Sequence, residues 1–241
     1  MSGPRPVVLV TGGGRRIGRA IAVHLASMEF DVAIHFHHSE SGARETAEKC
    51  RARGVKANWF GADFAEPASV QMLVERVKAS HGRIDALVNS AAVMLRTPLE
   101  TLSVAQWDQI FAVNLRAPFF LSLAVARLMP QGGAIVNIAD HLAEESWTQL
   151  APHGISKAGV VAMTRHLAAQ LAPRVRVNAV SPGAVLPPDD FDHDARKRLA
   201  DDTLLQRLGT PEDVAGAVGY LLRAPYVTGQ VLVVDGGRTV R

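Results

Sequence analysis

The chain has 241 residues, of which 48% are hydrophobic and 20% are charged, and its formal net charge is +3. This length can bury a full core as one domain, and the composition is typical of a soluble enzyme. The single cysteine, Cys50, excludes an intrachain disulfide and fits a reducing compartment. The N-terminal MSGPRP lacks the apolar segment of a signal peptide, and no window approaches a membrane span. We therefore expect a cytoplasmic protein that does not bind a membrane.

Short apolar runs alternate with amphipathic runs along the chain. The apolar runs predict seven strands, at Val7–Val10, Asp31–Phe36, Val55–Gly61, Ile84–Asn89, Ala134–Ile138, Val175–Val180 and Val231–Val234. The amphipathic runs predict helices at Arg19–Leu25, Ser41–Arg53, Pro67–Ser80, Ser103–Met129 (bent near Pro118), Ile155–Leu171 and Pro211–Arg223. This alternation predicts a single α/β domain, with a doubly wound parallel sheet and helices on both faces.

Two stretches near residue 190 fall outside this pattern. Pro187–Asp194 is rich in proline and aspartate and is expected to be a loop or lid. The triplet Arg196-Lys197-Arg198 is the longest basic run, and we interpret it as the solvated face of a helix. No nucleic-acid partner is therefore expected.

A glycine cluster directly follows the first strand. Gly12, Gly13, Gly14 and Gly18 supply a tight turn and let backbone amides approach a ligand. A helix begins at this turn, so free N–H groups and the helix dipole favour an anion there. A dinucleotide pyrophosphate is the usual guest of such a strand–turn–helix unit.

Further short motifs follow across nearly the whole chain. In order they are Thr11-Gly12, Asp63-Phe64, Asn89-Ser90-Ala91-Ala92, Asn114, Ser181-Pro182-Gly183, Val227-Thr228-Gly229 and Asp235-Gly236-Gly237. Together they resemble the short-chain dehydrogenase/reductase family. The resemblance implies a single Rossmann domain over residues 1–241, with strand order 3-2-1-4-5-6-7 and a substrate loop at about residues 184–204.

The resemblance also implies a homodimer or homotetramer. Family members usually pair their central helices, which here are Ser103–Met129 and Ile155–Leu171. Apolar residues on these helices offer surface for such pairing: Phe119, Phe120, Leu121, Val125, Val160, Val161 and Met163.

Within the family, one subgroup resembles this chain more closely. The glycine turn reads T-G-x-x-x-R-x-G, with Arg16 at the sixth position. This arginine, the run His35-Phe36-His37-His38-Ser39, and the ending Asp235-Gly236-Gly237-Arg238 are similar to pteridine reductases and dihydromonapterin (alternative dihydrofolate) reductases. The planar donor of Arg16 can reach both a phosphate and a substrate carbonyl. The subgroup implies NADPH-dependent reduction of a dihydropterin-like substrate.

The second strand indicates which dinucleotide is bound. NAD enzymes place an acid at the end of this strand for the ribose 2′-hydroxyl, whereas here no acid occurs before Glu40. Arg15, His37, His38 and Ser39 can instead donate to the 2′-phosphate of NADPH. The expected cofactor-binding set is Gly12, Arg15, Arg16, Ile17, His35, His37, His38, Ser39, Asp63, Phe64, Asn89, Ser90, Ala91, Lys157, Pro182 and Gly183.

A metal site at His35, His37 and His38 is the alternative reading of the same run. No cysteine or clustered acid completes a ligand set there. No metal is therefore expected.

The catalytic positions depart from the family pattern, which uses Ser, Tyr and Lys. Asp140 stands where pteridine reductases have Asp, Lys157 matches the lysine, and His153 occupies the tyrosine position. Asn114 matches the family's active-site asparagine. An imidazole titrates near neutrality, so His153 can deliver a proton directly, and His141 is a weaker candidate for that role.

The expected substrate contacts also differ from those of pterin reductases. Ala92 and Met94 stand where these relatives have a serine and a stacking aromatic residue, while Arg16 and Trp147 complete the expected set. Three hypotheses remain open. The protein is an NADPH-dependent reductase of a dihydropterin or another planar C=N or C=O substrate, a reductase of a non-pterin carbonyl compound, or a catalytically silent NADP(H)-binding protein.

Overall fold

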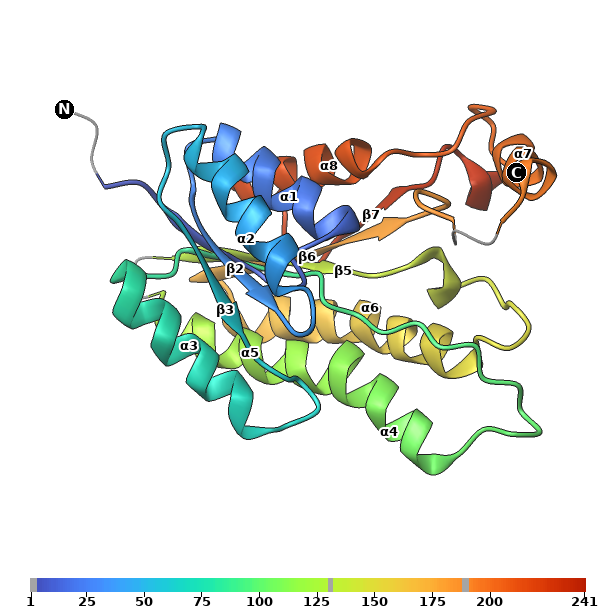
Figure 1. The fold of residues 1–241 in the computed structure, drawn as a ribbon, viewed down its shortest axis with the longest axis horizontal. Helices are drawn as coiled ribbons and strands as arrows, with labels where there is room; N and C mark the ends of the chain where they lie inside the picture. The colour runs from blue at the N-terminus through green and yellow to red at the C-terminus, as the bar shows by residue number, and fades with distance from the viewer. Residues whose placement is uncertain (1–3, 130–131, 188–190) are drawn as a thin grey trace.

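Seven parallel strands form one sheet, in the order β3-β2-β1-β4-β5-β6-β7 (Figure 1). The computed structural model describes residues 4–129, 132–187 and 191–241. Its strands are β1 (Val7–Val10), β2 (Asp31–Phe36), β3 (Ala57–Gly61), β4 (Ala86–Asn89), β5 (Gly133–Ile138), β6 (Val175–Pro182) and β7 (Val231–Val234). The strand order implied by the family resemblance is confirmed, as is the single α/β Rossmann architecture.

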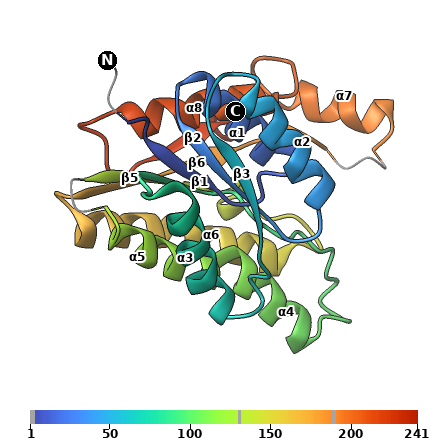
Figure 2. The ribbon, with the colours of Figure 1, turned by 60° about the vertical axis from the view of Figure 1, so that its left-hand side comes forward.

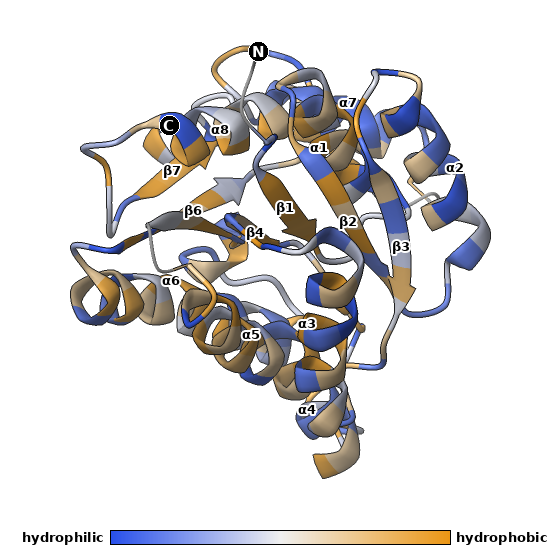
Figure 3. Cartoon of the chain, turned by 90° about the vertical axis from the view of Figure 1, so that its left-hand side faces the viewer, coloured by the Kyte–Doolittle hydropathy of each residue, from blue (hydrophilic) through white to orange (hydrophobic). Residues whose placement is uncertain are grey.

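Two layers of helices cover the sheet (Figure 1), and Figure 2 shows the twisted strands between them. One layer consists of α1 (Arg16–Ser27), α2 (Glu40–Arg51) and α8 (Pro211–Arg223). The other consists of α3 (Ala68–His81), α4 (Val104–Phe111), α5 (Ala117–Ala126) and α6 (Ala151–Leu171). The strands are mostly apolar and the outer helix surfaces polar (Figure 3), because a strand covered on both sides has no face in water.

Successive strand residues supply two separate cores. Val8 and Val10 pack in the cluster that contains Leu25 of α1 and Val218 of α8. Leu9, between them, points to the opposite face and packs in the cluster that contains Leu121 of α5. Side chains alternate across a strand, so one apolar run serves both layers.

The long helix expected over Ser103–Met129 is divided by a π-helical turn at Ala112–Arg116. The irregularity ends two residues before Pro118, near the expected bend, and because the helical run continues without a break through Ala126, the missing N–H of Pro118 removes a hydrogen bond to the preceding turn. A π turn inserts an extra residue into a helix and is frequent at functional sites. Here it carries Asn114, which is buried.

One helical run contradicts the expectation that no window approaches a membrane span. Val104–Ala126 has 23 residues and is apolar enough to cross a membrane, judged by length and composition. Half of its most apolar window is buried within the protein. A core helix of a soluble protein passes the same test, so this run is weak evidence for a membrane segment.

The stretch expected to be a loop or lid contains the start of a helix. Residues 188–190 lie outside the described part, and α7 spans His193–Asp201. The Asp192 carboxylate accepts a hydrogen bond of 2.7 Å from the Ala195 amide and caps α7. Lys197 and Arg198 are exposed on this helix, in agreement with the interpretation of the basic triplet.

Candidate active site

The glycine cluster forms a cradle between β1 and α1. Gly12 has a φ of +65°, and a Cβ atom there would lie 2.9 Å from the Cα of Ala91. A Cβ at Gly14 would lie 2.9 Å from the Ser39 carbonyl oxygen, and one at Gly18 would collide with the Gly12 carbonyl. Only glycine fits these positions, and the N-terminus of α1 faces the space they leave. The residues present therefore fit a dinucleotide pyrophosphate.

The hydroxyl of Thr11 connects the cradle to the end of β4. Its oxygen accepts hydrogen bonds from the Ser90 and Ala91 amides, at 2.9 and 3.0 Å. The expected motif after β4 thus lies directly beside the glycine turn. The carboxyl ends of β1 and β4 meet where the strand order reverses, which is the usual dinucleotide site of this fold.

His35 was expected to contact the cofactor, but it lies beneath the cradle. Its side chain is buried, Nδ1 accepts from the Gly12 amide at 3.3 Å, and Nε2 donates to the Ala62 carbonyl at 3.0 Å. Burial, the largest effect, lowers the pKa of His35 to about 4. This residue therefore supports the turn as a neutral ring and does not face a 2′-phosphate. Its ring stacks on Phe64, with centroids 4.1 Å apart.

The other expected phosphate donors lie at the rim of the cradle. Arg15 and His38 are exposed, and Ser39 is half-buried at the N-terminus of α2. His37 Nε2 lies 3.5 Å from Asp63 Oδ2, which places the expected acidic residue next to the histidine run. Among the described residues, no group of three or more His, Cys, Asp or Glu is placed to hold a metal ion.

Arg16 contacts the segment that begins the expected substrate loop. Its Nη2 donates to the Leu186 carbonyl at 2.5 Å, across 170 positions in the chain. Its φ is +50°, an uncommon value for a residue with a side chain. Arg16 therefore connects the cofactor cradle to the 184–204 region. Ile17 packs against the core cluster under α1, so its side chain faces inward.

A buried row of polar side chains holds α5 and α6 against the sheet. Asn89 Nδ2 donates to Ser122 at 3.1 Å and to Asn137 Oδ1 at 2.8 Å. Asn137 Nδ2 in turn donates to Thr164 at 2.9 Å. Asn89 was expected near the cofactor, whereas Asn137 and Thr164 carry no sequence signal that would have found them.

Asn114 fixes the backbone next to the catalytic positions. Its Oδ1 accepts from the Val93 amide at 2.8 Å, and its Nδ2 donates to the Val93 carbonyl at 3.0 Å. The same Nδ2 lies 3.1 Å from Ser156 Oγ on α6. The asparagine thus joins the segment after β4 to the helix that carries His153 and Lys157.

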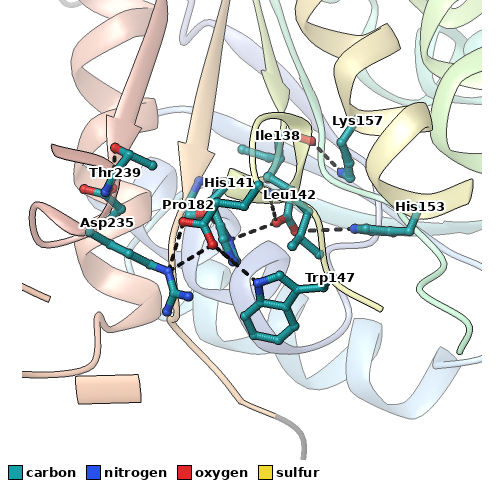
Figure 4. Close-up of polar contacts among 12 residues, drawn as sticks. Ile138, His141, Leu142, Trp147, His153, Lys157, Pro182, Asp235 and Thr239 are labelled. Atoms are coloured by element: carbon teal, nitrogen blue, oxygen red, sulfur yellow. Dashed lines mark hydrogen bonds and ion pairs between the residues drawn. The ribbon is translucent and has the colours of Figure 1, made fainter. Parts of the chain in front are cut away.

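Lys157 projects from α6 toward the end of β5. Its Nζ donates to the Ile138 carbonyl at 2.7 Å, and the side chain is buried (Figure 4). Burial lowers the pKa of Lys157, while the negative charge of Asp140 acts in the opposite direction. Asp140 is therefore the nearby negative charge that favours the ammonium form of Lys157.

His153 faces Asp140 and not an open space. Its Nε2 lies 3.4 Å from Asp140 Oδ2, and its Nδ1 lies 3.1 Å from the Val93 carbonyl oxygen. The His153 residue is only 2% exposed, whereas the Asp140 side chain is 25% exposed. His153 therefore lies behind the more exposed Asp140 carboxylate, and direct proton delivery by His153 stays a prediction.

Asp140 stands between two imidazole rings. His141 Nδ1 lies 3.0 Å from Asp140 Oδ1, opposite to His153, and the Leu142 amide donates to the same oxygen at 3.0 Å. Burial raises the pKa of Asp140, but the hydrogen bonds from His141 and His153, the Lys157 charge and the Leu142 amide together hold it well below its usual range. The carboxylate is thus ionised and surrounded by donors.

The expected substrate residues line two parts of the site. Ala92 and Met94 are exposed after β4, with Met94 at 52%. Trp147 lies across the site, where its Nε1 donates to Glu145 at 3.3 Å. Pro182 accepts from His141 Nδ1 at 3.3 Å, and a Cβ at Gly183 would lie 2.7 Å from the Cβ of Asp235. The tail segment after β7 therefore packs closely beside the catalytic residues.

Comparison with known proteins agrees with this geometry. A family model described as enoyl-(acyl carrier protein) reductase matches residues 13–239. A D-threitol dehydrogenase from Mycolicibacterium smegmatis is 37% identical over 245 residues, covering 98% of this chain and 93% of the relative. The chain belongs to the short-chain dehydrogenase/reductase family. It is an oxidoreductase of that family.

Two further members extend this comparison. A 3-oxoacyl-(acyl-carrier-protein) reductase from Staphylococcus epidermidis is 31% identical over 236 residues, covering 95% of this chain and 97% of the relative. The crystal structure of a blue fluorescent protein from a metagenomic library, in complex with NADPH, is 35% identical with a TM-score of 0.90 and 97% coverage of each chain. None of these three family members is named for a pterin.

Proposed function

We propose that the protein is an NADPH-dependent reductase of a small carbonyl compound. The observation that carries the proposal is the Asp140 carboxylate, held between His153 and His141 at the end of β5 and close to the buried Lys157. This group of donors lies at the same edge of the sheet as the glycine cradle. A hydride acceptor bound between them has a proton source on one side and the dinucleotide on the other.

Four residues of the chain have separate roles in the proposed reaction. NADPH, when bound, supplies the hydride. Asp140 has the most open side chain of the catalytic group and meets the substrate oxygen, while His153 donates a hydrogen bond to the Asp140 carboxylate. Lys157 places a positive charge next to the oxygen that becomes negative. Asn114 fixes the backbone of Val93, the residue whose carbonyl oxygen contacts His153.

The walls of the site favour a non-pterin carbonyl substrate. Ala92 and Met94 leave no aromatic side chain after β4, so a pterin ring lacks one stacking surface there. A second candidate, a dihydropterin, is supported by Arg16 and Asp140, which this chain shares with the pteridine reductase subgroup. A dihydropterin needs an aromatic stacking surface after β4, whereas a small carbonyl compound does not.

A turnover panel separates these candidates. NADPH consumption is followed with a dihydropterin, an α-hydroxy ketone and a 3-oxoacyl thioester, and NADPH binding is measured alongside by fluorescence. We expect reduction of at least one carbonyl compound and little or none of the pterin. Tight NADPH binding without any turnover would overturn the proposal in favour of a silent NADP(H)-binding protein.

We also propose a cytoplasmic homo-oligomer, a dimer or tetramer, without a nucleic-acid or membrane partner. Leu121, Val125, Val160 and Met163 were expected to offer pairing surface, but they are buried in the core. Phe119 and Phe120 are exposed at 36% and 55%, so these two carry the apolar surface of α5. A stable monomer at micromolar concentration in sedimentation would contradict the pairing.

A further inference from the structure

A series of charged side chains leads from Asp140 through His141 to the tail segment after β7. Figure 4 labels His141 and, on the tail segment, Asp235 and Thr239. His141 follows Asp140, and its Nε2 lies 4.0 Å from Glu145 Oε2. Arg238 Nε donates to both oxygens of Glu145, at 3.0 and 3.2 Å. Its Nη1 lies 3.9 Å from Asp202, just after α7. These contacts join three segments that are far apart in the sequence.

The two histidines beside Asp140 have different surroundings. Both ring nitrogens of His153 face oxygen atoms within hydrogen-bond distance. His141 uses only Nδ1, toward Asp140 and the Pro182 carbonyl, while its buried Nε2 has no hydrogen-bond partner. A neutral ring has one lone pair, which points from Nδ1 toward Asp140 in one tautomer and from Nε2 toward Glu145 in the other. A charged ring directs an N–H group toward both, so the geometry favours the imidazolium.

The charges around His141 act in the same direction. Burial lowers its pKa, but the hydrogen bond and charge of Asp140, together with Glu145, raise the pKa above the ordinary value despite the opposing charge of Arg238. Lys157 on α6 is a cation near Asp140, and His153 on α6 donates to its other oxygen. Trp147 meets His141 edge-on, with ring centroids 5.6 Å apart, and adds no charge.

We propose that His141 is the proton reserve of the active site and that Glu145, held by Arg238 and Trp147, is the positioning residue that keeps this ring charged. The inference rests on the proposed carbonyl reduction. Each reduction consumes one hydride and one proton, and the proton leaves through Asp140. His141 then passes its Nδ1 proton to Asp140 Oδ1 and becomes neutral. The neutral ring keeps its Nε2–H toward Glu145, and a proton from solvent water returns to Nδ1 through the Asp140 carboxylate, whose side chain is 25% exposed.

The test measures His141 directly by NMR titration of histidine-labelled protein without cofactor. The His141 signal is assigned by its loss in His141→Asn, whose NADPH affinity and melting temperature report on folding. We expect Glu145→Gln to lower the titration midpoint of His141, and Glu145→Asp, which retains the charge, to keep most of the wild-type value. Glu144→Gln is the matched control, because Glu144 is an exposed neighbour outside this series.

The same variants are followed through the pH profile of kcat. The alkaline limb should move down in Glu145→Gln by the shift that NMR records, with no change in NADPH affinity. An unmoved His141 midpoint or kcat profile, with wild-type turnover intact, would overturn this inference and leave the proposed function standing. Absence of carbonyl turnover in the wild type would overturn the proposed function, and the proton reserve with it.

Discussion

The two halves of the active site are built by different means. The cofactor cradle depends on the backbone, because Gly12, Gly14 and Gly18 stand where any side chain would meet a neighbouring main-chain atom. The proton site depends on charge, because each oxygen of the Asp140 carboxylate lies within hydrogen-bond distance of an imidazole nitrogen. The cradle therefore tolerates no added volume, whereas the proton site tolerates no loss of charge. Four changes test this difference.

The largest effect is expected from Asp140→Asn, which keeps the shape of the side chain and removes its charge. Without the carboxylate, neither imidazole passes a proton to the substrate, so kcat should fall by about 10²–10⁴-fold, the usual range for one acid–base group. NADPH affinity should change little, because the cradle is untouched. Steady-state kinetics and a fluorescence titration measure the two quantities. A parallel loss of affinity would show that the halves are not separable.

Because of His35, the stability of the cofactor cradle should decrease at acidic pH. Its folded pKa of about 4 lies below the ordinary 6.5, so the unfolded chain takes up the proton first as pH falls. The free energy of unfolding should therefore be highest above pH 6.5 and decline toward pH 4, by up to about 3 kcal/mol from this residue. Urea unfolding across this range measures the loss. His35→Gln should flatten that part of the profile, and an unchanged slope would contradict the role of His35.

Gly18→Ala should damage the cradle through volume alone. The added methyl group collides with the Gly12 carbonyl, which we expect to cost about 1–3 kcal/mol of stability and to weaken NADPH binding. Gly216→Ala on α8 is the control, since a Cβ there meets nothing within 4 Å. That substitution should stabilise the fold by about 0.4–1 kcal/mol. Thermal melts of both variants measure the change in stability. Similar changes at the two positions would contradict a steric role for Gly18.

The smallest expected effect concerns the choice of dinucleotide. NADPH should bind at least about tenfold more tightly than NADH, or roughly 1.4 kcal/mol, since Arg15, His38 and Ser39 lie at the rim without a competing acid at the end of β2. Ser39→Asp should reverse this preference by repelling the 2′-phosphate. Titration with both cofactors measures it. Equal dissociation constants in the wild-type protein would contradict the assignment.

The sequence predicted the elements whose boundaries follow from local chemistry. β1, β2, β7 and α8 have the expected bounds, because apolar runs and the Thr210 cap define them. The start of α7 was missed, since its polar sequence has no apolar stripe to distinguish it from a loop. The irregularity expected near Pro118 is present as the π turn that ends two residues before it, because proline has no N–H to donate to the preceding turn.

The site was predictable to the extent that it depends on spacing. Asp140 and His153 are thirteen positions apart and do meet, as the family resemblance implied. The burial of His35 was not predictable, because strand alternation places it on the same face as the exposed His37, and the Ala62 carbonyl that it contacts is 27 positions away. Glu145 and Arg238 were missed as partners, since 93 positions separate them and no local pattern connects them.

The π turn at Ala112–Arg116 has a consequence for insertions and deletions. An extra residue absorbed within one turn leaves the helical phase before and after it unchanged. Ile110 and Leu121 can therefore remain in the core on either side while Asn114 occupies a position that a regular helix would not offer. Deleting one residue of the turn should leave a folded, continuous helix in which Asn114 no longer makes its two hydrogen bonds with the Val93 backbone.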